Sequence, residues 1–177
     1  MTTPATPVPD DKDWTWVLER PCPECGFDGS AVSHTEVADR IKADAAQWPR
    51  RLSAADVAVR PRPTVWSVLE YGCHVRDVHR IFNDRVRLML SEDEPRFANW
   101  DQDATAIEDD YGSQDPVVVA SELVDAAAAV TATYERVPRG AWSRRGLRSN
   151  GSEFTVASIA VYHLHDVVHH AHDVDHG

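Results

Sequence analysis

The last part of the chain combines the apolar rhythm of a helix with an unusually dense group of histidines. Five of the nine histidines lie in the stretch from His163 to His172. Apolar residues run through the same region: Ile159, Val161, Leu164, Val167, Val168 and Val174. This pattern predicts a helix with a buried face rather than a polar tail, so the fold must place several imidazoles beside its core.

The length and composition of the chain are typical of one globular domain. The chain has 177 residues, of which 42% are hydrophobic and 27% are charged, and these values fit a single packed core. The net charge of −11 argues against a nucleic-acid surface, which needs a concentrated basic face. We find no run of about 18 apolar residues and no signal peptide, so we expect a cytoplasmic protein without a membrane span.

Four segments carry apolar residues at a spacing of three or four and have helix start or stop signals. The segments that we expect to be helical are 33–51, 64–90, 115–137 and 153 to nearly the end of the chain. The region between the second and third helices would be a long connection with a short helix, and residues 139–151 a loop or short hairpin. With little strand signal elsewhere, the predicted fold class is all-α, a four-helix bundle.

Two of the three cysteines form a Cys-x-x-Cys motif, Cys22 and Cys25, near the N-terminus. The motif resembles one knuckle of a zinc ribbon, but the chain has no second Cys-x-x-Cys to complete four ligands. Three interpretations stay open: a structural turn with partly buried thiols, a metal site completed by histidine or by a partner chain, and a redox pair. We divide the chain into an N-terminal extension, residues 1–32, and a bundle, residues 33–177.

The last predicted helix carries two pairs of metal-binding side chains, because residues i and i+4 share a helix face. His165 and His169 form one pair, and Asp166 and His170 form a second that is rotated by about 100°. His74, on the inward face of the second predicted helix, supplies a third ligand. Such a set binds a divalent metal and leaves positions open for water or substrate. The alternative is a group of surface histidines whose charge suits a helix C-terminus.

Two motifs resemble those of the DinB-like four-helix-bundle proteins. In residues 66–77, WSVLEYGCHVRD, a tryptophan and a serine open the helix, and a histidine follows the glutamate by four positions. In residues 165–172, HDVVHHAH, two histidines stand four apart, as in the family's closing motif. The resemblance implies an up-down-down-up bundle with a long connection between its second and third helices. It also implies a metal held by His74, His165 and His169.

The related mycothiol-dependent maleylpyruvate isomerases place a carboxylate and a histidine at i and i+4. In that register, Asp166 and His170 would replace His165 and His169. We prefer the all-histidine register because it matches the aspartate directly after the first histidine and keeps the polar residue three positions after the second. His170 would then lie outside the metal site.

The resemblance implies a metal-dependent transferase or isomerase that uses mycothiol, bacillithiol or glutathione. An open metal position would bind the thiol and lower its pKa. Candidates for proton transfer or for support of the ligands are Glu70, Asp77 and Tyr162. Arg144 and Arg148, in the loop before the last helix, either bind a carboxylate of the cosubstrate or form a solvated charge cluster.

Two other functions stay open on the same ligands. One is a hydrolase that uses metal-bound hydroxide, and the other is a metal-binding or stress-response protein without turnover, whose site is closed by a fourth ligand. Zinc is the expected ion, although imidazole ligands also suit nickel, iron or copper. The expected partners are a small-molecule substrate and, since such bundles commonly dimerise, a second copy of the chain.

Overall fold

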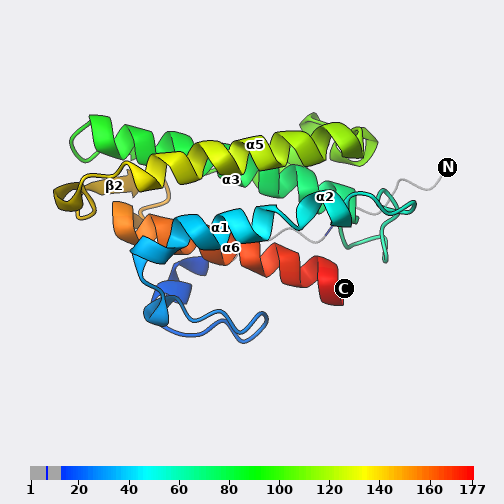
Figure 1. Cartoon of the computed structure of the whole chain (residues 1–177), viewed down its shortest axis with the longest axis horizontal. Coiled ribbons are helices and arrows are strands. Elements are labelled where there is room, and N and C mark those ends of the chain that lie inside the picture. Colours follow the sequence, from blue (N-terminus) through cyan, green and yellow to red (C-terminus); the bar gives the residue numbers. More distant parts are fainter. Residues whose placement is uncertain (1–6, 8–12) are drawn as a thin grey trace.

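Four long helical segments form a bundle in the computed structural model, which describes residue 7 and residues 13–177 (Figure 1). The bundle consists of α1 (Val37–Ala45) with its continuation α2 (Trp48–Arg51), α3 (Val68–Ser91), α5 (Pro116–Glu135) and α6 (Val156–His176). This confirms the predicted all-α class and the four-helix bundle. Most of residues 1–12 of the expected N-terminal extension lie outside the described residues.

The four helices follow the up-down-down-up order. In Figure 1, α1 and α6 run from left to right, whereas α3 and α5 run from right to left. Both α1 and α3 pack against α5 and α6, so α1 and α3 lie diagonally across the bundle. The connection after α3 returns the chain to the end at which α3 began. It contains the short helix α4 (Gln102–Glu108) and the 3-10 turn η4 (Tyr111–Ser113).

Side-chain caps set the helix starts. Ser67 and Glu70 form a capping box at α3, in which the Ser67 N–H donates to the Glu70 carboxylate over 2.7 Å. Thr155 and Ser158 cap α6 in the same way, and Asp115 caps α5. Each cap satisfies backbone donors that the first helical turn leaves unpaired. These local signals explain why the predicted starts lie within a few residues of the observed ones.

The first bundle helix is interrupted, although the sequence predicted one helix over 33–51. Its capping box is present, but it caps the 3-10 turn η3 (His34–Glu36) before α1 begins. A second break separates α1 from α2, whose first turn contains Pro49. Proline lacks the N–H that would continue the hydrogen-bond ladder of α1, so the chain bends there.

A three-stranded sheet closes one end of the bundle. Its strands are β1 (Arg96–Phe97), β2 (Arg145–Arg148) and β3 (Glu153–Thr155), and the 3-10 turn η5 (Arg139–Ala141) precedes β2. β2 and β3 form the expected hairpin, while β1 pairs with β2 in parallel. Strand β1 was not predicted from the sequence, because so short a strand shows no periodicity. Gly146 allows the sheet to approach α3, since a Cβ there would lie 2.8 Å from Met89 Cγ.

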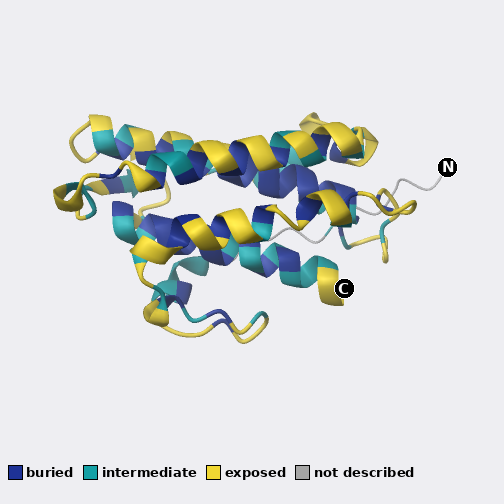
Figure 2. Cartoon of the chain, viewed as in Figure 1, coloured by how far each residue is buried: buried dark blue, intermediate teal, exposed yellow. Residues whose placement is uncertain are grey.

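The N-terminal extension packs along α6 and contains the 3-10 turns η1 (Trp14–Leu18) and η2 (Gly29–Ala31). Figure 2 shows that buried residues line the inner faces of the bundle and also occur within this extension. Val17 and Cys22 are buried to the same degree as core residues. The extension therefore covers a face of α6 that the other bundle helices leave free.

Among the residues that the structure describes, one helix, α5, is long and apolar enough to cross a membrane by length and composition alone. In the bundle its inner face packs against α3 and α1, with Val119, Leu123 and Val130 buried. A core helix of a globular domain passes the same test, and packing accounts for the inner face of α5, whereas Val117 and Val118 near its start are exposed.

Candidate metal centre

Three potential metal ligands meet between α3 and α6. His74 comes from α3, and Asp166 and His170 come from α6, and one ligand atom of each lies within 4.8 Å of the others. His74 Nε2 is 3.7 Å from Asp166 Oδ1, and His170 Nε2 is 3.5 Å from the same oxygen. We call these three residues the inter-helix site.

The inter-helix site fits a divalent ion in both spacing and chemistry. Nitrogen and oxygen ligands at about 2.0–2.2 Å from one ion lie roughly 3.0–3.4 Å apart, close to the observed separations. Both ring nitrogens of His74 and Oδ1 of Asp166 are buried without a hydrogen-bond partner among the described residues. An unpaired buried polar group costs about 1–3 kcal/mol, and coordination would remove that cost.

Aromatic rings hold the imidazole of His74 in place. The ring stacks on Trp100, with centroids 5.2 Å apart and planes 4° from parallel, and it also contacts Trp66 at 5.2 Å. His170 lies against the edge of His74 at 4.6 Å and near Tyr71 at 5.4 Å. The ligands are thus oriented before any ion binds, which reduces the entropy lost on binding.

The charges around the inter-helix site favour the protonation states that bind metals. Burial lowers the pKa of His74, and the neighbouring His170 lowers it further, so His74 is a neutral imidazole. Burial acts to raise the pKa of Asp166, but His74 and His170 bring that pKa well below its usual value. His170 Nδ1 lies 3.2 Å from Asp173 Oδ2, a contact that leaves Nε2 facing Asp166.

A cleft of about 600 Å³ opens beside the site. Asp166 and His170 line it together with Trp100, while Arg85 and Arg148 are among its other lining residues. The cleft therefore brings two cationic side chains into the same space as two of the potential metal ligands. The lining also contains Asp13, Asp101 and Asp103, so the cleft has mixed charge and its two arginines are the positions that could bind an anionic group of a small substrate.

The structure does not gather the predicted ligands His74, His165 and His169 into one group. His165 and His169 instead lie with Cys22 and Cys25 of the N-terminal extension, and the ligand atoms of these four are within 4.8 Å of one another. We call this second group the cysteine–histidine cluster. His74 meets the Asp166 and His170 pair, which corresponds to the other register.

The predicted acids of α3 have local partners away from the cleft lining. Glu70 belongs to the helix cap and binds Arg60 through several hydrogen bonds, one of 2.9 Å. Asp77 accepts hydrogen bonds from Arg76 at 2.9 Å and from the Tyr111 hydroxyl at 2.6 Å. Both contact sets stabilise the start of α3 and the connection that follows it.

The remaining predicted residues divide between the cleft and the sheet. Tyr162 and Arg148 line the cleft, and Arg148 lies over the Tyr162 ring at 5.7 Å. Arg144 instead donates to the backbone carbonyl of Met89 at 2.7 Å and to that of Glu92. It therefore ties the loop before β2 to the end of α3.

Two lining residues, Arg85 and Trp100, were not predicted as parts of a site. Arg85 lies three residues after Phe82 and four before Met89, so it occupies the buried stripe of α3. A charged residue at such a position is a recognisable signal for a functional cleft. Trp100 lies in the irregular connection, whose path no periodicity could predict.

The fold and the inter-helix site define a four-helix-bundle protein with a candidate metal centre between its second and last long helices. The chain belongs to the DinB superfamily, whose sequence profile matches residues 37–174. The fold is similar to that of YfiT from Bacillus subtilis, described as a probable metal-dependent hydrolase with an unusual four-helix bundle topology. The TM-score is 0.69 at 19% identity, over 78% of this chain and 82% of YfiT. No curated protein matches this chain in sequence.

Proposed function

We propose that the protein is a metal-dependent enzyme that uses a low-molecular-weight thiol, as a transferase or an isomerase. The ion would be held by His74, Asp166 and His170. The ligand register supports this choice, because α6 offers a carboxylate and a histidine at i and i+4 to a histidine of α3. That is the register of the mycothiol-dependent maleylpyruvate isomerases, which are related to the DinB-like proteins that the two sequence motifs resemble.

Three protein ligands beside an open cleft are typical of a catalytic rather than a structural metal site. A bound divalent ion would supply a Lewis acid that holds a thiol sulfur and lowers its pKa. Zinc is the expected ion, although two imidazoles with one carboxylate also suit iron(II) and nickel.

The chain's own side chains would position the organic reactants. Arg85 donates to the carbonyl of Ala98 at 3.1 Å, and Arg148 donates to Asn150 at 2.9 Å. These acceptors are neutral, so both guanidinium charges could bind a carboxylate in the cleft, where Asp13 would compete for Arg148. Burial raises the pKa of Tyr162, so its hydroxyl stays protonated and can donate to a substrate oxygen.

The similarity to YfiT favours a second candidate, a metal-dependent hydrolase acting through the same inter-helix site. The two candidates differ in what the reaction consumes. A hydrolase turns over with water alone, whereas a transferase or isomerase of the proposed kind needs the thiol.

The test measures turnover of tag-free, metal-loaded protein with mycothiol, bacillithiol or glutathione and a panel of electrophiles and unsaturated acids. A parallel panel of chromogenic esters and amides is run without thiol. We expect turnover only when one of the thiols is present, and we expect it to disappear in His74→Ala. Ester or amide hydrolysis without thiol that depends on His74 would replace the first candidate with the second.

A further inference from the structure

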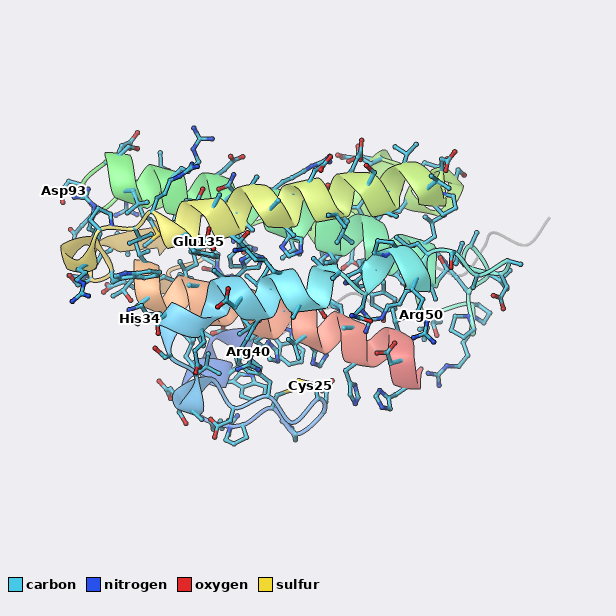
Figure 3. All side chains as sticks on the ribbon, in the orientation of Figure 1. Cys25, His34, Arg40, Arg50, Asp93 and Glu135 are labelled. Carbon is cyan, nitrogen blue, oxygen red and sulfur yellow. The ribbon has the colours of Figure 1, made fainter. Side chains whose placement is uncertain are left out.

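The cysteine–histidine cluster joins two segments that are far apart in the sequence. Cys22 and Cys25 come from the N-terminal extension, and His165 and His169 come from α6. Cys22 Sγ is 3.8 Å from His169 Nδ1, and Cys22, His165 and His169 are buried. Figure 3 labels Cys25 on the loop that runs beside α6.

The local sequence shapes both halves of the cluster. The backbone turns tightly after Cys22, whose carbonyl accepts from Gly26 N–H at 2.8 Å and whose N–H donates to Phe27 O at 2.7 Å. Gly26 has φ of +74°, a left-handed conformation that glycine adopts without strain. This turn directs both sulfurs to the same side, while the i, i+4 spacing places both imidazoles on one face of α6.

One atom of the cluster lacks the hydrogen-bond partner that a buried polar group needs. His165 Nε2 is buried without a hydrogen-bond partner among the described residues, and His165 itself is 3% exposed. All three cysteines of the chain are free thiols. Trp14 packs on both imidazoles, with centroids 5.5 Å from His165 and 5.0 Å from His169, and Phe27 packs on His165 at 5.4 Å. These rings form an apolar shell that limits solvent access to the nitrogen and sulfur atoms, as expected around a closed metal site.

We propose that Cys22, Cys25, His165 and His169 bind one zinc ion in a closed tetrahedral site, separate from the inter-helix site. Zinc–sulfur bonds of about 2.3 Å and zinc–nitrogen bonds of about 2.0–2.1 Å place sulfur and nitrogen ligands about 3.6 Å apart, close to the observed 3.8 Å. Four protein ligands complete the tetrahedron, so this ion holds structure and has no position for substrate.

Neighbouring carboxylates support this assignment. With Nδ1 of His169 facing Cys22, its Nε2 lies 3.5 Å from Glu24 Oε2 and 3.8 Å from Asp173 Oδ2. Acids at the second nitrogen of a ligand histidine orient the ring and raise its basicity. Asp173 also contacts His170 of the inter-helix site, so one carboxylate lies between the two metal positions.

The ion would fix the N-terminal extension against α6. Trp14, which packs on both histidines of the cluster, lines the 600 Å³ cleft together with them. The zinc site would therefore maintain one wall of the cleft as well as the attachment of residues 13–32. This inference does not depend on which reaction the cleft carries out.

Elemental analysis of tag-free, full-length protein tests the proposal. We expect two equivalents of metal in the native chain and the loss of one in Cys22→Ser/Cys25→Ser. The matched control is Cys73→Ala, whose sulfur contacts the Tyr111 carbonyl and belongs to neither site; it should keep both. His74→Ala should keep the equivalent that the cysteine variant loses, and this result would support the zinc site even if the native chain held only that ion.

A spectroscopic measurement keeps the test valid if the cysteine variant does not fold. Native protein reconstituted with cobalt(II) should show a near-ultraviolet thiolate-to-cobalt band and the intense visible bands of tetrahedral cobalt. A thiol-blocking mercurial should release one equivalent of metal. The proposal is overturned if cobalt gives no thiolate band, if the cysteine variant folds with unchanged metal content, or if Cys22 and Cys25 are isolated as a disulfide.

Discussion

Two neighbouring faces of α6 carry the same ligand spacing but meet different partners. Asp166 and His170 meet one histidine of α3 beside an open cleft. His165 and His169, one residue earlier along the helix, also line this cleft, but they meet two cysteines of the N-terminal extension. The partner segment, rather than the spacing on the helix, therefore determines whether a pair belongs to an open three-ligand set or to a closed four-ligand set.

Removing His74, the α3 ligand of the inter-helix site, should give the largest difference between the two metal sites. His74→Ala should abolish turnover, with a loss beyond the roughly 10–100-fold typical of residues that only support a metal ligand. The metal of the cysteine–histidine cluster should stay bound. Steady-state kinetics and elemental analysis check this, with His79→Ala, whose ring bonds His163 at 3.0 Å, as a buried-histidine control. Loss of the metal of the cysteine–histidine cluster in His74→Ala, or an equal loss of turnover in His79→Ala, would contradict the separate roles of the two sites.

Asp173 tests the link between the faces, because it contacts one histidine of each pair. Asp173→Asn should weaken metal binding at the inter-helix site by about 10–100-fold, since its contact with His170 is the shorter one at 3.2 Å. The effect at the cysteine–histidine cluster should be smaller, because His169 Nε2 also has Glu24 nearby. Competition titrations with a chelating dye measure both affinities. A larger loss at the cluster would contradict this assignment of Asp173.

Arg148 and Arg144 compare a cleft residue with a residue that only anchors the loop. Arg148→Gln should raise KM for a carboxylate substrate about tenfold, as expected for the loss of roughly 1.4 kcal/mol from one charge-assisted hydrogen bond. Arg144→Gln should leave KM unchanged and lower the unfolding midpoint instead, because the Arg144 side chain donates to backbone carbonyls at the end of α3. The measurement is KM and the unfolding midpoint of both variants. A similar KM shift in both would remove Arg148 from the substrate site.

Asp77 lies on α3, outside both faces of α6, and provides a comparison in which only stability should change. Burial acts to raise its pKa, but hydrogen bonds from Arg76 and Tyr111 leave it below the ordinary 3.8. Its stabilising contribution is therefore present above that value and is lost as pH falls through the lower folded-state pKa. Asp77→Asn should cost about 1–3 kcal/mol of unfolding free energy near neutral pH, without change in metal content. Denaturant unfolding at successive pH values should show the deficit shrinking in acid; a constant deficit would disprove the charge dependence.

Much of the bundle could be predicted because its helices have local causes. The capping boxes at Ser33 and Ser67, the Asp115 cap and the apolar stripes each act within a few residues. The two-residue strand β1 was missed because it is too short to show a period. The break before Pro49 was missed although proline is a local signal for it.

The grouping of the metal-ligand side chains was harder to predict from the sequence, for a geometric reason. His165 and Asp166 are about 100° apart on one helix, so periodicity alone does not say which of them faces α3. The N-terminal Cys-x-x-Cys held the missing information, because a two-cysteine knuckle needs two further ligands. Pairing it with His165 and His169 would have left Asp166 and His170 for His74.

Anomalous diffraction from crystals of the tag-free protein, recorded at the absorption edges of zinc, nickel and iron, tests the central claim most directly. We expect two metal positions. One should be bound by His74, Asp166 and His170 with open positions toward the cleft, and the other should be enclosed by Cys22, Cys25, His165 and His169. A single ion bound by His74, His165 and His169 together would contradict it.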